Sequence, residues 1–120
     1  MSRGKLWFAI FLCLPGMVSA SQALDVVVSE VDWMGQPQTK SPAHEWIELY
    51  NNTANDIVLN GWQLMAQDGT PKIQLKGVIP ARNFFLLERT SDETLPDLVA
   101  IQIYKGALEN TGENLKLLDP

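Results

Sequence analysis

The sequence predicts an all-β protein folded as an antiparallel β-sandwich. Seven or so short segments rich in β-branched and aromatic residues follow one another, and Gly, Pro, Asn and Asp separate them at intervals of roughly eight to fifteen residues. No segment repeats apolar residues at the i, i+3, i+4, i+7 spacing of an amphipathic helix over three turns. The length of 120 residues suits a single domain.

The first two strands are predicted by valine content and by alternation. Asp25–Trp33 is rich in valine, and the Gly- and Pro-containing stretch 35–42 after it predicts a loop. In Glu45–Tyr50, Ile47 and Leu49 point one way and the residues between them point the other way. We expect the first set to face a core.

The middle of the chain carries two turn signals. Ile57–Leu59 and Trp62–Ala66 flank an Asn-Gly pair at 60–61, which predicts either a tight hairpin or a glycine bulge within one bent strand. An Asp-Gly pair at 68–69 precedes a further strand, Ile73–Leu75. Trp46 and Trp62 are large apolar residues of the kind that fill a sandwich core.

Three strands complete the sandwich. Asn83–Glu88 is apolar on both faces, as expected for a central strand. Leu98–Tyr104 places Val99, Ile101 and Ile103 on one face, and Leu115–Leu118 follows as the last strand. One helical turn is conceivable over 90–96, capped by its Thr or Ser.

The N-terminus has the order of a secretory signal peptide. Arg3 and Lys5 precede the apolar run Leu6–Leu14, which is too short for a membrane span of ~20 residues, and small residues follow at 18–20. We expect residues 1–20 to be a signal peptide, cleaved after 20 or after 23, and residues 24–120 to be the sandwich domain. The alternative is an uncleaved N-terminal anchor. The predicted location is secreted, periplasmic or at the cell surface, with no transmembrane segment after cleavage.

The net charge and the cysteine content exclude several classes of binding partner and structural site. The formal net charge is −5, and removal of residues 1–20 would leave −7 and no cysteine, since Cys13 lies in the leader. A polyanion such as nucleic acid is therefore a poor partner. A single Cys and a single His exclude zinc fingers and intrachain disulfides.

Several strings together resemble the lamin tail domain of the exported bacterial type. They are EWIELYN at 45–51, IVLNGWQL at 57–64, IPA at 79–81, FFLLE at 84–88 and GENLKL at 112–117. The resemblance covers about Val26 to Asp119. It implies an immunoglobulin-like β-sandwich, which occurs in nuclear lamins and as a module of exported bacterial proteins, often beside hydrolase, nuclease or adhesion domains.

Two departures from that family bear on the interpretation. No heptad-bearing rod is present, which excludes a filament-forming lamin for this chain. The sequence ends at 118–120, where the family usually continues with a further turn and strand. We expect the chain to be truncated there, and the alternative is a sandwich that closes differently.

Residues able to carry chemistry are sparse, and no catalytic set is predicted. His44 with Glu45 and Glu48 is the only cluster that mixes a base with carboxylates, but Glu45 and Glu48 point to opposite faces of a strand. No Gly-x-Ser-x-Gly elbow or phosphate-binding glycine loop occurs. The acidic groups 25/30/32 and 92/93/97 lack the spacing of a calcium loop and are interpreted as solvated surface. We expect no metal and no cofactor.

Three residues are candidates for binding. Trp33 stands before a loop, where sandwiches carry function, and Tyr104 adds a second aromatic residue. Glu48 lies between two aromatic residues on one face, and its plainer interpretation is pairing with a basic residue or with backbone amides. Asn51 begins a formal glycosylation sequon that we expect to go unused.

The function expected from these observations is that of an exported, non-catalytic interaction or structural module. It would present loops or sheet edges to a protein or polysaccharide of the cell envelope or surface. The alternative is an N-terminal accessory domain of a larger secreted hydrolase or nuclease whose catalytic part lies beyond residue 120. The oligomeric state is not predicted.

Overall fold

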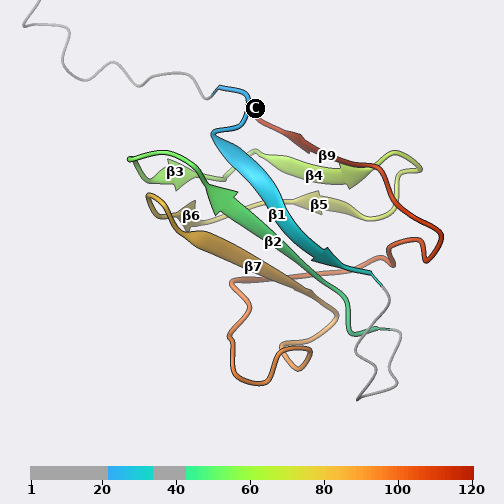
Figure 1. Cartoon of the computed structure of the whole chain (residues 1–120). Coiled ribbons are helices and arrows are strands. Elements are labelled where there is room, and N and C mark those ends of the chain that lie inside the picture. Colours follow the sequence, from blue (N-terminus) through green and yellow to red (C-terminus); the bar gives the residue numbers. More distant parts are fainter. Residues whose placement is uncertain (1–21, 34–42) are drawn as a thin grey trace, which may run out of the picture.

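The computed structural model describes residues 22–33 and 43–120, and these residues form strands and turns without a helix (Figure 1). The expected signal peptide and the expected loop at 35–42 lie outside the described residues. The prediction of an all-β protein is confirmed. In chain order the strands are β1 (Val26–Asp32), β2 (Trp46–Asn51), β3 (Ile57–Val58), β4 (Gln63–Ala66), β5 (Lys72–Gln74), β6 (Val78–Ile79), β7 (Phe84–Arg89), β8 (Gln102–Tyr104) and β9 (Leu115–Leu118).

Two sheets face each other across the core (Figure 1). One has the strand order β1-β2-β7-β8 and the other the order β5-β4-β9, while β3 and β6 form a small third sheet. Neighbouring strands are antiparallel except β7 and β8, which run parallel. The expectation of a purely antiparallel sandwich is wrong for this pair, because the long connection over residues 90–101 turns the chain back, so that β8 begins opposite Leu87 and runs in the same direction as β7.

Alternation along the central strands builds the core. Ile47 and Leu49 of β2 and Phe85 and Leu87 of β7 are fully buried, and Leu64 of β4 meets them from the opposite sheet. The expected inward face of β2 and the expected central place of β7 are therefore both confirmed.

The two tryptophans expected in the core have different positions. Trp62 is buried, as expected. Trp46 is only half-buried, because its neighbour Ile47 takes the inward position and Trp46 must point to the outer face of the sheet. The Asn-Gly pair before Trp62 forms a turn in which the Trp62 amide donates to Leu59 O at 2.9 Å and Gly61 has a φ of 88°. This turn joins strands of different sheets, so it is neither the expected hairpin nor a bulge.

The segment between β7 and β8 departs most from expectation. β8 begins only at Gln102, and Val99, Ile101 and Ile103 are exposed instead of facing a core. The conceivable helical turn at 90–96 is absent, and Thr90 has a φ of 72°, outside the helical region. The reason is that amides of this segment donate to the Glu88 carboxylate instead of to helix carbonyls.

Candidate functional site

The outer face of the four-stranded sheet combines carboxylates with aromatic rings. The strand register places Glu30 opposite Glu48 and Asp32 opposite Trp46, so their side chains share one face. Further along, Tyr50 lies opposite Phe84, and the centroids of the two rings are 4.8 Å apart. We call this surface the acidic–aromatic face; it comprises Glu30, Asp32, Trp46, Glu48, Tyr50 and Phe84.

A bulge in β1 decides which residues of that strand reach this face. The pairing register shifts between Val28 and Glu30, which leaves Ser29 as the extra residue. Without that shift Glu30 would lie opposite the buried Ile47 and would point into the core. The bulge thus directs Glu30 and Asp32 outward and leaves Val31 facing inward.

The bulge is fixed by the candidate residue Glu48. The Ser29 hydroxyl donates to Glu48 Oε1 at 2.7 Å and lies 3.2 Å from the Glu48 carbonyl oxygen. Glu48 therefore accepts from a serine hydroxyl rather than from the basic residue or backbone amides that its sequence position suggests. Its carboxylate holds the two strands in the register that builds the face.

An open hollow of about 240 Å³ lies at the β1 end of the acidic–aromatic face. Trp33, which is 40% exposed, lies at its wall beside the half-buried Trp46. Among the described residues, the lining contains two carboxylates and no basic side chain. It consists of Glu30, Val31, Asp32, Trp33 and Trp46. Carboxylates accept hydrogen bonds, and indole rings offer flat apolar contact area, so the hollow suits a ligand that has both donors and an apolar surface.

Tyr104, the third candidate, lies away from this face. It is buried beside Glu45 and Arg89, and burial raises the pKa of its hydroxyl. A binding role for its ring requires exposure, and the structure places it in the interior instead. Alternation explains the position, because Tyr104 pairs with Arg89 on the inward side of the sheet.

An ion pair lies beside Tyr104 at one end of the sandwich. Glu45 Oε1 is 3.3 Å from Arg89 Nη1, and Glu45 Oε2 accepts from the Leu108 amide at 3.0 Å. Burial raises the pKa of the Glu45 carboxyl, while the Leu108 amide and the Arg89 guanidinium act in the opposite direction. The ion pair connects the start of β2 to the end of β7, and the Leu108 amide connects Glu45 to the segment after β8, so these contacts are structural.

Glu88 is a second buried carboxylate. It is 0% exposed, and its two oxygens accept from the Thr94 and Leu95 amides, each at 3.2 Å. Burial is the main cause that raises its pKa; the two amides and the charge of His44 lower it, and Asp92 raises it further. Glu88 thereby holds the segment 90–98 against β7.

The sequence cluster of His44, Glu45 and Glu48 is not brought together. Glu45 points inward to Arg89, Glu48 points outward to Ser29, and His44 acts electrostatically on Glu88. The opposite directions predicted for Glu45 and Glu48 agree with this arrangement.

The acidic group formed by residues 25, 30 and 32 of the sequence is divided in the structure. Asp25 accepts from the Gln22 amide before β1, while Glu30 and Asp32 lie toward the other end of that strand. Within residues 22–33 and 43–120, no three His, Cys, Asp or Glu side chains are grouped so that they could hold a metal ion.

Asn51 is a buried structural residue. Its amide nitrogen donates to the carbonyls of Asn55, Ile79 and Pro80 at 2.7, 2.9 and 3.1 Å, and its oxygen accepts from Thr53. A side chain with every donor and acceptor engaged in the interior cannot take a glycan in the folded protein.

The sequence does not predict the hollow, although the spacing of two of its lining residues indicates that they share one face of a strand. Glu30 and Asp32 are two residues apart, the spacing that puts side chains on one strand face. Trp46 could not be added to them, because its size predicts a place in the core.

Comparison with known proteins identifies the family. A sequence model of the lamin tail domain matches residues 19–120. No curated protein matches the sequence. None of the described residues forms a helix long and apolar enough to cross a membrane. Lamin tail domains are non-enzymatic, immunoglobulin-like domains, and the observed facing sheets are compatible with that fold. The chain belongs to the lamin tail domain family.

Proposed function

We propose that the protein is an exported interaction module that binds a polysaccharide or a protein of the cell envelope or surface through its acidic–aromatic face. The observation that carries the proposal is the hollow, where two indole rings and two carboxylates meet on a sheet face. Membership in a non-enzymatic domain family supports a binding role over a catalytic one.

Both partner classes have chemistry that fits this lining. Sugar hydroxyls donate to carboxylates, and the apolar face of a sugar ring stacks on an indole. A lysine or arginine side chain of a protein would form an ion pair with the same carboxylates and a cation–π contact with the same rings. The two classes are distinguished by experiment.

The binding test compares protease-treated and untreated envelope fractions immobilised on a surface. Retention after protease treatment identifies a polysaccharide, and loss of retention identifies a protein. We expect Trp33→Ala to weaken binding about tenfold or more, because aromatic residues in a binding hollow carry a large share of the binding energy. Val58→Ser, on exposed β3, is the matched control and should bind normally. Equal binding by the wild type and Trp33→Ala would refute the proposal.

Export is tested separately by sequencing the N-terminus of the protein recovered outside the cytoplasm. Cleavage after residue 20 or 23 is the expected result, since an apolar run of signal-peptide length precedes both sites. Recovery of the exported protein with Met1 intact would contradict cleavage.

A further inference from the structure

Exposed apolar side chains are concentrated in one short segment. Among the described residues ten large apolar side chains are clearly exposed, and four of these lie within residues 98–103. We call these four the apolar stripe: Leu98 (57% exposed), Val99 (78%), Ile101 (54%) and Ile103 (41%). Scattered exposed apolar residues are normal, but a contiguous group indicates a contact surface.

The apolar stripe is held in a defined position. The Ala100 amide, between Val99 and Ile101, donates to Asp92 Oδ1 at 2.8 Å, and the Ile101 amide donates to Leu86 O at 2.9 Å. Glu88 fixes the preceding turn through the Thr94 and Leu95 amides. A surface ordered before binding loses less conformational entropy when a partner binds.

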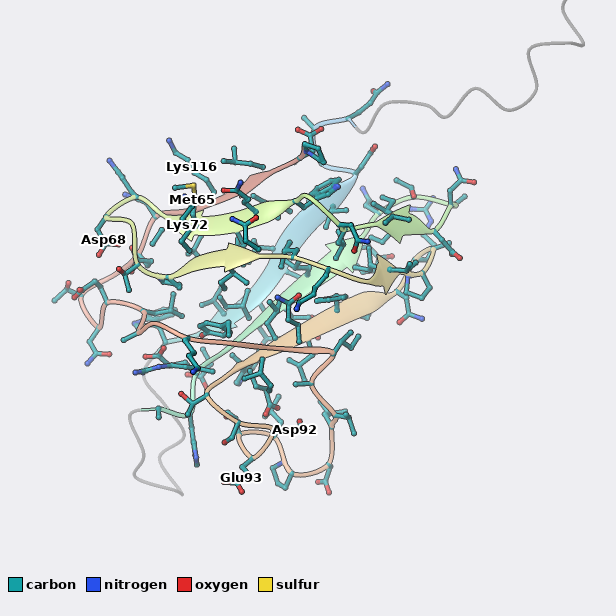
Figure 2. All side chains as sticks on the ribbon, turned by 180° about the vertical axis from the view of Figure 1, so that it is seen from behind. Met65, Asp68, Lys72, Asp92, Glu93 and Lys116 are labelled. Atoms are coloured by element: carbon teal, nitrogen blue, oxygen red, sulfur yellow. The ribbon has the colours of Figure 1, made fainter. Side chains whose placement is uncertain are left out.

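The loop before the apolar stripe is acidic. Asp92, Glu93 and Asp97 belong to this segment and outnumber the two lysines beside β8, which are Lys105 and Lys76, whose backbone amide donates to Gln102 Oε1 at 3.2 Å. Figure 2 shows Asp92 and Glu93 on this loop, well away from Lys72 and Lys116 on the other sheet. A second copy would bring two acidic loops together, and an anionic lipid surface would be repelled. The charge therefore favours a basic partner.

We propose that the apolar stripe docks an apolar segment of another protein that is flanked by lysine or arginine residues. The site is independent of the hollow in the acidic–aromatic face. The hollow lies at β1 and the apolar stripe at β8, which are the two opposite edges of the four-stranded sheet. Apolar contact supplies the affinity, and the carboxylates of the loop select for the flanking charges.

The test uses the full chain and a fluorescent synthetic peptide of alternating valine and threonine with lysines at both ends. Its twin carries glutamates in place of the lysines. Fluorescence anisotropy should show binding of the lysine peptide and at least tenfold weaker binding of the glutamate peptide. The double variant Val99→Ser/Ile101→Thr should lose at least tenfold in affinity for the lysine peptide. Glu93→Gln/Asp97→Asn should lose severalfold, because the apolar contacts remain.

Two control variants establish whether the peptide binds at the apolar stripe itself. Val58→Ser and Leu118→Ser each remove an exposed apolar side chain elsewhere; both should bind the lysine peptide as the wild type does. Equal affinity for the two peptides, or no effect of Val99→Ser/Ile101→Thr, would overturn the proposal. So would stripe-dependent binding to phosphatidylcholine vesicles, which would identify a lipid surface, or stripe-dependent dimerisation in light scattering, which would identify a second copy.

Discussion

At the scale of single residues, the buried carboxylates are the groups with the greatest energetic consequence. Glu88 is fully buried, and the Thr94 and Leu95 amides offset only part of the cost of burying its charge. The Glu45 carboxylate is also buried, but it has a cationic partner, because the Arg89 guanidinium lies 3.3 Å away. Both carboxyl groups nevertheless have pKa values raised above the ordinary 4.5.

The raised pKa of Glu88 predicts how stability changes with pH. The folded protein holds this proton more tightly than the unfolded chain does. The contribution of Glu88 to the free energy of unfolding therefore increases as the pH falls from its raised pKa toward 4.5, and decreases as the pH rises through the same interval. Glu88→Gln should flatten this dependence, as measured by urea denaturation between neutral and mildly acidic pH. Glu93→Gln, which removes an exposed carboxylate, is the control. An identical pH profile in Glu88→Gln and the wild type would contradict the assignment.

At the scale of elements, close approaches of the backbone hold the connecting segments in place. The segment after β8 passes over the hairpin between β4 and β5. A Cβ at Gly106 would lie 3.1 Å from Thr70 Cγ2 and 3.2 Å from Pro71 Cα, and Gly106 has a φ of 105°. Gly112 has a similar φ of 119° with nothing within 4 Å of such a Cβ. A substitution at Gly112 therefore adds backbone strain alone, whereas a substitution at Gly106 adds both backbone strain and a steric clash.

This pair predicts unequal costs for the same substitution. Gly112→Ala should lower the free energy of unfolding by about 1–2 kcal/mol, from backbone strain alone. Gly106→Ala should cost about 1–3 kcal/mol more, because the added methyl also displaces the backbone of the buried Pro71, which yields less readily than a flexible side-chain end. Chemical denaturation of both variants measures the difference. Equal losses would mean that the hairpin moves aside freely.

At the scale of the whole molecule, the two sheets carry surfaces of different chemistry. The outer face of the four-stranded sheet bears carboxylates and aromatic rings. On the three-stranded sheet, Met65 lies between Lys72 and Lys116 in one cross-strand row, and Figure 2 shows these three side chains together. The sandwich separates these surfaces by its buried core, and places the hollow and the apolar stripe at opposite edges of one sheet.

This separation predicts that changes at the two proposed sites are additive. Trp33→Ala and Val99→Ser should each change the free energy of unfolding by no more than about 0.5 kcal/mol, because both side chains are exposed. The double variant should show the sum of the two changes to within about 0.5 kcal/mol, in stability and in the affinity for each ligand. Thermal denaturation together with the two binding assays measures this. A larger interaction would show that the sites communicate through the sheet.

The alternation of residues along the sequence is enough to predict several strands and, in the candidate site, the outward direction of Glu48. The alternation in Glu45–Tyr50 identifies Ile47 and Leu49 as inward residues, and the apolar run in Asn83–Glu88 identifies a central strand. The same approach fails at Trp46, where size predicts a core position and alternation predicts the outward position that the structure has. β6 is also missed, since two residues provide too little pattern to detect.

Short-range pattern is sufficient to establish that this protein is built from short strands, because alternation and turn residues act over a few neighbouring positions. Which apolar faces are covered is settled only when the strands assemble. Val99, Ile101 and Ile103 have a pattern suited to a core, yet no strand of the described chain lies over them. The bulge at Ser29 and the burial of Glu88 likewise depend on Glu48 and on residues 94–95. Burial depends on what the fold places opposite a side chain, and that is set by contacts between segments far apart in the sequence.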